Sequence, residues 1–183
     1  MWDNGRMSTV GADTPPLRHV IVAGGTAAQW EATPAERWSV LVDELGKVAD
    51  HVGASWLTLR PFGGDQAAGV SVSDGHVGGC LVHVDARVDG RQALAEAVDA
   101  LRRRGIDITE SSIAAAMNAP AQTDPDLVVV LGAAQRLPLS LAWELAYSEL
   151  VFLEVEWSQL SAAHLVDAIE SFAQRHRRFG GID

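Results

Sequence analysis

The sequence contains one cysteine, one lysine and one tyrosine, and it has no long apolar run. The single cysteine, Cys80, excludes an intrachain disulfide, which is typical of proteins in a reducing compartment. No stretch approaches the roughly 20 apolar residues that a membrane-spanning helix requires. The first 18 residues are polar, include Pro15-Pro16 and contain no signal-peptide core. These absences predict a cytoplasmic protein without a membrane span.

Positive charge is also scarce. The 14 Lys and Arg residues stand against 24 Asp and Glu residues, and the formal net charge is −10. Because phosphate neutralisation needs exposed Lys and Arg, this acidity argues against broad nucleic-acid binding. The 183 residues, 48% of them apolar, are enough for one domain with a sizeable core.

Short apolar runs alternate with amphipathic segments along the chain. Strands are expected at 19–23, 56–59, 81–84, 127–131 and 150–155, with a loop over 63–78 around a short strand at 70–72. Helices are expected after a capping box at Thr33, from Gly90 to about Arg103 behind Asp89, from Thr109 or Ser112 to before Pro120, from Pro138 to Ser148, and after Ser161. The alternation predicts an α/β fold with a mostly parallel sheet flanked by helices. We expect a flexible tail over residues 1–18 and a single domain over 19–183.

The first predicted strand runs directly into the segment Ala23-Gly24-Gly25-Thr26-Ala27-Ala28. Glycines let a backbone approach an anion closely, and a following helix offers free amide groups. The spacing matches neither the dinucleotide-binding nor the P-loop pattern. The local residues therefore leave a phosphate-binding turn and a plain tight turn both open.

Cations gather at the end of the last predicted helix, in the segment Arg175-His176-Arg177-Arg178. Cations at a helix C-terminus interact favourably with the helix dipole, which is the simplest interpretation. The Phe179-Gly180-Gly181 turn that follows would also let Arg178 reach a phosphate in another chain.

Several motifs of the C-terminal third follow one another in a distinctive order: Asp124–Val129, Gln135–Leu137, Trp143–Leu150, Glu154–Trp157 and Arg178–Gly181. In this order they resemble the cis-prenyltransferase (undecaprenyl diphosphate synthase) family. A weaker resemblance covers His19–Trp30, Leu57–Phe62 and Val82–Arg91. Enzymes of that family add isopentenyl diphosphate units to an allylic diphosphate, and each is a single α/β domain that works as a dimer with a hydrophobic tunnel. The resemblance implies this fold, shortened in the tunnel-lining region, because the span before Asp124 is short for the family.

The resemblance also shows which functional positions have changed. The family's first loop has the sequence Asp-Gly-Asn-Gly-Arg-Trp, and here Gly25 replaces the Asp that organises Mg²⁺ and Gln29 replaces the Arg that grips the allylic diphosphate. In the second diphosphate site an Arg and a Ser are replaced by Val130 and Pro138. The positions that match the family are Trp30 and Arg136 as substrate-binding residues and, more weakly, Glu149 as a metal ligand.

These losses predict a chain that is inactive by itself. Ionising an allylic diphosphate needs concentrated positive charge, much of it from metal ions held by carboxylates. Glycine cannot hold Mg²⁺, and glutamine cannot replace arginine as a bidentate cation. The lone chain is therefore expected to use no cofactor.

The pattern resembles the accessory subunit of heteromeric cis-prenyltransferases, which lacks the catalytic loop and keeps an Arg-X-Gly ending. We expect a heterodimer, or a larger assembly, with a catalytic cis-prenyltransferase subunit that holds Mg²⁺ and makes a polyprenyl diphosphate from isoprenoid diphosphate substrates. Arg178 and the Gly180 amide would then act in trans in the partner's active site.

Two other functions remain open. One is a short-chain prenyl or terpene-forming transferase that is active by itself through Arg136 and Glu149. The other is a prenyl diphosphate-binding or structural protein. Peripheral membrane association through a lipid product is compatible with the first expectation. The apolar side chains of Trp143, Tyr147, Leu150 and Phe152 fit either the core or a dimer contact.

Overall fold

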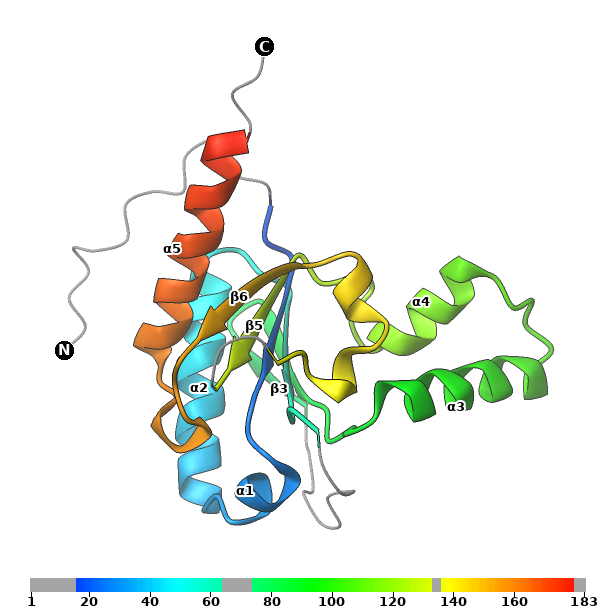
Figure 1. Ribbon diagram of the computed structural model, residues 1–183, viewed down its shortest axis with the longest axis horizontal. Helices are drawn as coiled ribbons and strands as arrows, with labels where there is room; N and C mark the ends of the chain where they lie inside the picture. Colours follow the sequence, from blue (N-terminus) through cyan, green and yellow to red (C-terminus); the bar gives the residue numbers. More distant parts are fainter. Residues whose placement is uncertain (1–15, 64–73, 133–135, 180–183) are drawn as a thin grey trace.

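The computed structural model describes residues 16–63, 74–132 and 136–179, and the side chains of residues 176–179 are not described. In this part of the chain one sheet has the strand order β3-β4-β2-β1-β5-β6. All neighbouring strands are parallel except the β3–β4 pair, so the predicted α/β architecture is confirmed (Figure 1). The strands are β1 His19–Ala23, β2 Trp56–Arg60, β3 Gly75–Val77, β4 Cys80–Val84, β5 Leu127–Leu131 and β6 Glu149–Leu153.

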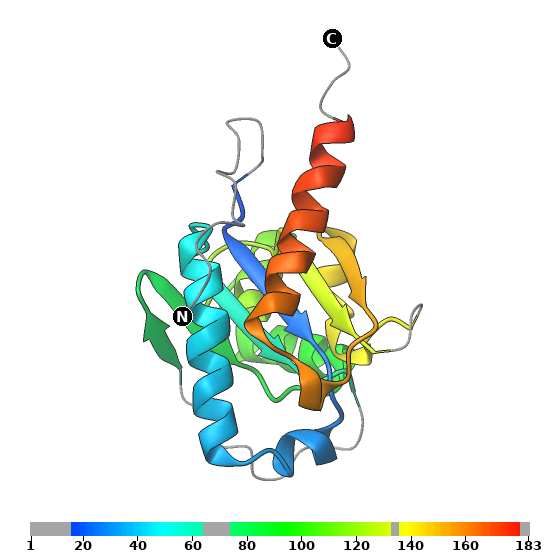
Figure 2. The same ribbon diagram turned by 90° about the vertical axis from the view of Figure 1, so that its left-hand side faces the viewer.

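The larger core lies between the sheet and two long helices, α2 (Ala35–His51) and α5 (Ala162–Phe179), which run side by side over one face (Figures 1 and 2). Alternate strand residues, among them Val20, Val22 and Leu57, point into this core. Because side chains alternate along a strand, this pattern sends the intervening residues to the other face.

The second face carries a smaller core built on Ile21, Val128, Val130 and Leu141. It is covered by the 3-10 turns η1 (Leu139–Leu141) and η2 (Glu144–Ala146). Helices α3 (Gly90–Arg103) and α4 (Glu110–Asn118) extend from this face to one side (Figure 1). Within the described residues no helix is long and apolar enough to cross a membrane.

A buried ionic network joins β2, the end of β4 and η2. Arg60 is 2% exposed, and its Nη2 lies 2.8 Å from Asp85 Oδ2, while its Nη1 contacts the carboxylate of the fully buried Glu144. Arg87 Nε donates a hydrogen bond to Asp85 Oδ2 at 2.6 Å. Burial by itself would raise the pKa of Asp85, but the charge of Arg60 and the hydrogen bond from Arg87 outweigh burial and lower that pKa to about 2.

The start of α2 differs from the sequence prediction. Pro34 occupies the N-cap position without a side-chain cap, and Thr33 instead donates to the Gln29 carbonyl and accepts a hydrogen bond from Trp157 Nε1 at 3.1 Å. The capping box lies earlier, at Thr26 and Gln29, where it starts the unpredicted helix α1 (Ala27–Glu31). Both segments contain cap residues at suitable spacing, but the Thr33 hydroxyl is already engaged by the Gln29 carbonyl and by Trp157.

Other boundaries are confirmed or corrected as follows. Asp89 caps α3, and α4 begins after Thr109 and ends before Pro120, as predicted. The helix predicted over 138–148 is wrong, since this segment forms the two 3-10 turns, and β6 ends at Leu153, two residues before the predicted end. The strand β3 lies in a segment predicted as loop, whereas the short strand predicted at 70–72 falls outside the described residues.

Candidate functional site

A pocket of about 260 Å³ lies at the carboxyl ends of the central strands. The chain leaves β1 toward α2 on one face and leaves β5 toward η1 on the other, so the neighbouring strands β1 and β5 form a switch point in the topology. Ligands of open α/β sheets commonly bind in the crevice at such a point. The lining residues come from the loops after four strands: Gly25, Thr26, Gln29, Phe62, Leu131, Gly132, Arg136, Val155, Glu156 and Trp157.

The first wall of the pocket is the loop after β1. Thr26 Oγ1 accepts a hydrogen bond from the Gln29 amide at 3.2 Å, and Gln29 Oε1 accepts one from the Thr26 amide at 2.8 Å. The Gln29 side chain therefore holds the first turn of α1 in place. A neutral amide engaged in this cap offers no bidentate cation to a diphosphate.

Gly25 occupies the tightest position of this loop. Its φ of +72° lies in the left-handed region that favours glycine, and a Cβ there would lie 2.8 Å from Trp157 Cγ and 2.9 Å from Trp30 Cδ1. Both the backbone conformation and the crowding disfavour any side chain at this position. A carboxylate could reach the pocket from residue 25 only if the tryptophans moved.

Those tryptophans form a cluster beneath the loop. Trp30 stacks on Trp157 at a centroid distance of 5.1 Å and meets Trp38 edge-on at 5.0 Å. Trp30 is 1% exposed, and its Nε1 donates a hydrogen bond to the Gly24 carbonyl at 2.8 Å. Trp30 thus supports the loop from below, and its predicted contact with substrate stays a prediction.

The charges that line the pocket are balanced. Arg136 and Glu156 are both exposed and carry opposite charges, and the other lining residues are neutral. Glu156 is the one carboxylate among the lining residues, and the described residues contain no group of three or more His, Cys, Asp and Glu that could hold a metal ion. Hard cations such as Mg²⁺ are held through carboxylates, so this donor set does not fit the metal that the resemblance implies.

The structure brings together only some of the residues that were singled out. Gly25, Gln29 and Arg136 share the pocket. Val130 is 2% exposed and points into the smaller core, and Pro138 is buried at the start of η1.

Glu149 lies at the amino end of its strand, whereas the pocket lies at the carboxyl ends of the strands. It is the first residue of β6 and pairs with Leu127 at the start of β5, and its Oε1 lies 3.4 Å from Arg175 Nη1. The structure therefore does not bring this predicted metal ligand together with Gly25 and Arg136. The predicted contribution in trans stays a prediction, because Gly180 and the Arg178 side chain fall outside the described residues, although Arg178 belongs to α5.

Phe62, Glu156 and Trp157 line the pocket without having been assigned a role from the sequence. Each follows a strand, and the carboxyl ends of parallel strands meet at one edge of a sheet. That rule could have grouped the segments, but it does not identify which side chain of each loop faces the pocket.

Comparison with known proteins agrees with the fold and the motifs. A family model described as putative undecaprenyl diphosphate synthase matches residues 70–180. Isoprenyl transferase 2 of Bradyrhizobium diazoefficiens is 43% identical over 91 residues, which are 50% of this chain and 36% of that protein. The (2E,6E)-farnesyl-diphosphate-specific ditrans,polycis-undecaprenyl-diphosphate synthase of Lactiplantibacillus plantarum is 41% identical over 98 residues, 52% of this chain and 38% of that protein. The chain thus spans less than half the length of these relatives.

Two solved structures share the fold. A probable undecaprenyl diphosphate synthase from Campylobacter jejuni superposes with a TM-score of 0.60 at 18% identity, over 90% of this chain and 98% of that chain. Lavandulyl diphosphate synthase from Lavandula x intermedia, solved with dimethylallyl diphosphate, gives a TM-score of 0.60 at 16% identity, over 85% and 94% of the two chains. With the family model matching more than half of its residues, this protein belongs to the putative undecaprenyl diphosphate synthase family, the cis-prenyltransferases.

Proposed function

We propose that this protein is the accessory, non-catalytic subunit of a heteromeric cis-prenyltransferase that makes a polyprenyl diphosphate. The observation that carries the proposal is Gly25. At the position where the family has its metal-organising Asp, the backbone has a φ of +72° and two tryptophans leave no room for a Cβ. The packing beneath the loop is thus adapted to the absence of a side chain.

The electrostatics of the pocket support the same conclusion. Cleavage of an allylic diphosphate places negative charge on the leaving group, and enzymes stabilise it with preorganised cations. Here one exposed arginine and one exposed glutamate line the pocket, and Gln29 is engaged in a helix cap. Arg136 alone does not supply the positive charge that two diphosphates demand.

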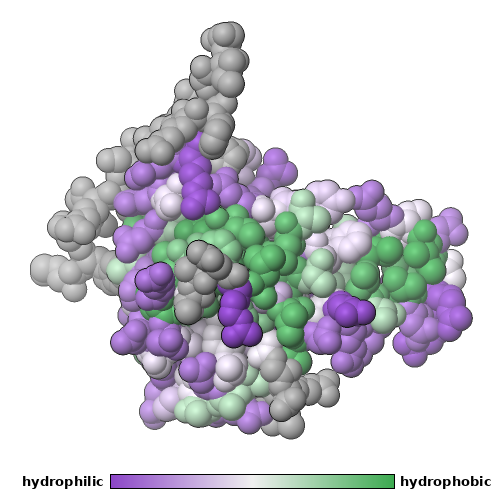
Figure 3. All heavy atoms as spheres, in the orientation of Figure 1, coloured by the Kyte–Doolittle hydropathy of each residue, from purple (hydrophilic) through white to green (hydrophobic). Residues whose placement is uncertain are grey.

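We propose that the catalytic partner docks on an exposed apolar surface of this chain. Hydrophobic residues gather on the face that carries β6 and the 3-10 turns (Figure 3). Among the large apolar side chains of these elements and the residues next to them, Leu137, Leu139, Tyr147 and Phe152 are 52%, 71%, 57% and 37% exposed. Leu150, in contrast, packs against the smaller core. Exposed apolar patches on a globular protein mark interaction surfaces, and β6 is one of the two edge strands of the sheet in the described residues, so this region suits assembly with a second chain.

The test is to purify the chain alone, and together with a cis-prenyltransferase from the same genome that has an intact Asp-Gly-Asn-Gly-Arg loop. Both preparations receive farnesyl diphosphate, radiolabelled isopentenyl diphosphate and Mg²⁺, and chain elongation is measured. We expect no turnover by the lone chain and turnover by the pair at a rate well above that of the partner alone. Mg²⁺ would be held mainly by the partner.

Two variants sharpen the test. Arg178→Ala should abolish most of the activity of the pair without preventing assembly, whereas Arg102→Ala, a helix-end arginine that is exposed on α3, should change nothing. Turnover by the lone chain that is lost in Arg136→Ala would place an active site in the chain's own pocket. That result would overturn the proposal in favour of a self-sufficient prenyltransferase.

A further inference from the structure

The turns η1 and η2 carry the two most exposed large apolar side chains of the described residues. Leu139 of η1 is 71% exposed, and Tyr147, which follows η2 directly, is 57% exposed. Both belong to the surface on which the catalytic partner is proposed to dock. The two side chains form one surface of constant shape only if the two turns keep a fixed spacing.

Local hydrogen bonds hold these turns only weakly. In η1 the Leu141 amide donates to the Pro138 carbonyl at 3.2 Å, and in η2 the Tyr147 amide donates to the Glu144 carbonyl at 3.3 Å. Short 3-10 turns have poorer hydrogen-bond geometry than an α-helix. The spacing of η1 and η2 therefore depends on contacts with the rest of the fold.

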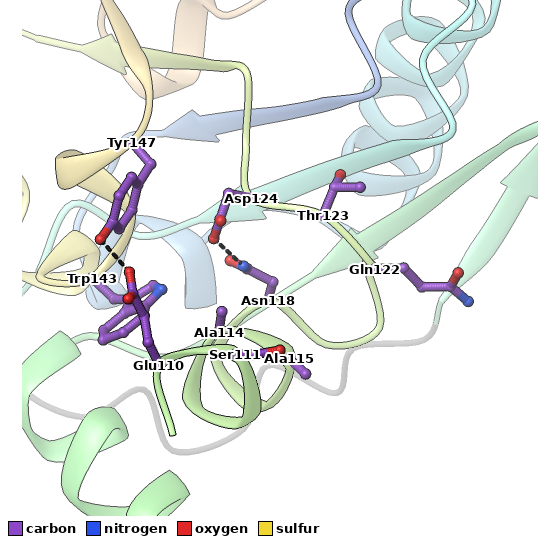
Figure 4. A pocket seen from close by; sticks show the side chains of 10 residues that line it. All are labelled: Glu110, Ser111, Ala114, Ala115, Asn118, Gln122, Thr123, Asp124, Trp143 and Tyr147. Carbon is purple, nitrogen blue, oxygen red and sulfur yellow. Dashed lines mark hydrogen bonds between the residues drawn. The ribbon is translucent and has the colours of Figure 1, made fainter. Parts of the chain in front are cut away.

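The outer side of η2 gives little of this support, because a second pocket of about 440 Å³ lies between α4 and the residues of the turn. Trp143 and Tyr147 meet Glu110 on one side of this pocket, and Asn118 and Asp124 lie on another (Figure 4). The Tyr147 hydroxyl donates a hydrogen bond to Glu110 Oε1 at 2.6 Å, but this contact is exposed, and water competes for both groups. The main support for η2 comes from inside the fold.

Arg60 contacts both turns from inside the fold. Its Nη1 donates a hydrogen bond to the Ser140 carbonyl of η1 at 3.3 Å and also contacts the Glu144 carboxylate at the start of η2. Its Nη2 lies 2.8 Å from Oδ2 of Asp85, which directly follows β4. Arg60 and Glu144 are 2% and 0% exposed. One planar guanidinium thus ties η1 and η2 to each other and to the sheet.

Stability by itself does not account for charged side chains at this place. The cost of desolvating a buried ion pair can exceed the attraction between its charges, and apolar side chains of similar size are often as stable or more so. The pairing here is also incomplete, since Arg60 Nε and Glu144 Oε2 are buried without a hydrogen-bond partner among the described residues. In some proteins, buried polar groups of this kind are retained because they specify one conformation.

We infer that Arg60 is a positioning residue for assembly, an inference that rests on the proposed function for its partner and docking surface. From inside the fold Arg60 fixes η1 relative to η2, so that Leu139 and Tyr147 present one surface of defined shape to the catalytic partner. Glu144 is the carboxylate through which Arg60 holds η2. Both residues act without touching the partner, because both are buried.

The test replaces the buried pair by apolar side chains of similar size, in a double variant that combines Arg60→Met with Glu144→Leu. Asp85 keeps Arg87, whose Nε donates a hydrogen bond to its Oδ2 at 2.6 Å, so the change leaves no buried charge unpaired. The midpoint of urea unfolding should hardly change. The Kd for the cis-prenyltransferase with the intact loop, measured by isothermal titration, should rise about tenfold, as for the loss of an interface anchor. A merely stabilising pair would lower the midpoint and leave the Kd of the folded chain unchanged.

Hydrogen exchange measures the positioning in the chain without its partner. The Leu139 amide donates to the Phe62 carbonyl at 3.1 Å, and the Tyr147 amide closes η2. In the double variant we expect both amides to exchange about tenfold faster, while the amides of β1 stay protected. Arg60→Lys keeps a buried cation but loses the planar fork, so its Kd should lie between those of the wild type and the double variant.

Leu139→Asp separates this inference from the proposed function. It changes the docking surface and leaves the buried network intact, so it should weaken partner binding without changing the exchange of the Tyr147 amide. Loss of binding in Leu139→Asp but not in the double variant overturns the role of Arg60 and leaves the proposed function standing. Unchanged binding in Leu139→Asp overturns the docking surface and the role of Arg60 together. Unchanged amide exchange in the double variant overturns the role of Arg60, whatever the partner does.

Discussion

The crowding at Gly25 makes a quantitative prediction about stability. In Gly25→Ala the new residue has to keep a φ of +72° and place its Cβ 2.8 Å from Trp157 Cγ. The left-handed conformation costs about 1–2 kcal/mol for a residue with a Cβ, and overpacking in a filled core costs about 1–3 kcal/mol. We therefore expect the free energy of unfolding to fall by about 2–5 kcal/mol, measured by urea denaturation followed through tryptophan fluorescence.

Gly105 provides the matched control. Its φ of +67° is close to that of Gly25, but nothing lies within 4 Å of the position that a Cβ would take. Gly105→Ala should therefore cost only the backbone part, about 1–2 kcal/mol. The difference between the two variants isolates the contact with the tryptophans, and equal losses in both would refute the argument that this loop has no room for a side chain.

The same geometry predicts the fate of a restored aspartate. Gly25→Asp should lose at least as much stability as Gly25→Ala and should remain inactive with farnesyl and isopentenyl diphosphates. Its carboxylate would join only Glu156 among the lining carboxylates, and the described residues contain no group of three or more His, Cys, Asp and Glu that could hold a metal ion. Turnover by Gly25→Asp without a partner subunit, measured by product extraction, would contradict this prediction. It would show that the missing aspartate is the one change that inactivates the chain.

Three further predictions concern the buried polar groups. Burial, opposed by a hydrogen bond to the Thr123 carbonyl, lowers the pKa of His19 to about 4, so His19 stays neutral in the fold while the unfolded chain gains a proton below pH 6.5. Stability should then fall by about 3 kcal/mol between pH 6.5 and 4, and the fall should shrink in His19→Gln but persist in the exposed control His51→Gln. Glu144→Ala, which removes one of the two buried carboxylates that pair with Arg60 and leaves Asp85 as the other, should cost about 3–5 kcal/mol by urea denaturation, and a loss below about 1 kcal/mol would contradict the network. Burial raises the pKa of Cys80 to about 11, so iodoacetamide should label it at pH 8 only after unfolding; rapid labelling of the native chain would disprove its burial.

Local signals in the sequence were sufficient where the chain decides its own conformation. Asp89 caps α3 because its carboxylate reaches the amides of Arg91 and Gln92, a contact within three residues. Likewise, the apolar run Leu127–Leu131 predicts a strand that is buried on both faces, and every one of its residues is buried. The helix predicted over 138–148 does not form, because Ser140 donates a hydrogen bond to the Pro61 carbonyl and Glu144 pairs with Arg60. Both partners are distant in sequence, and they hold the segment in two 3-10 turns.

For the candidate site, too, the sequence determined some features and the tertiary structure determined others. The sequence by itself determined the family resemblance and the loss of the first-loop aspartate, because both depend on residue identity at Gly25 and along the C-terminal motifs. Only the tertiary structure decided that residue 25 has no space for a side chain, since the obstructing Trp157 lies far away in the chain. It also separated Glu149 from Arg136 and gathered Asn118, Asp124 and Trp143 around a second pocket, because distances across a sheet depend on the strand order and register, which no local pattern encodes.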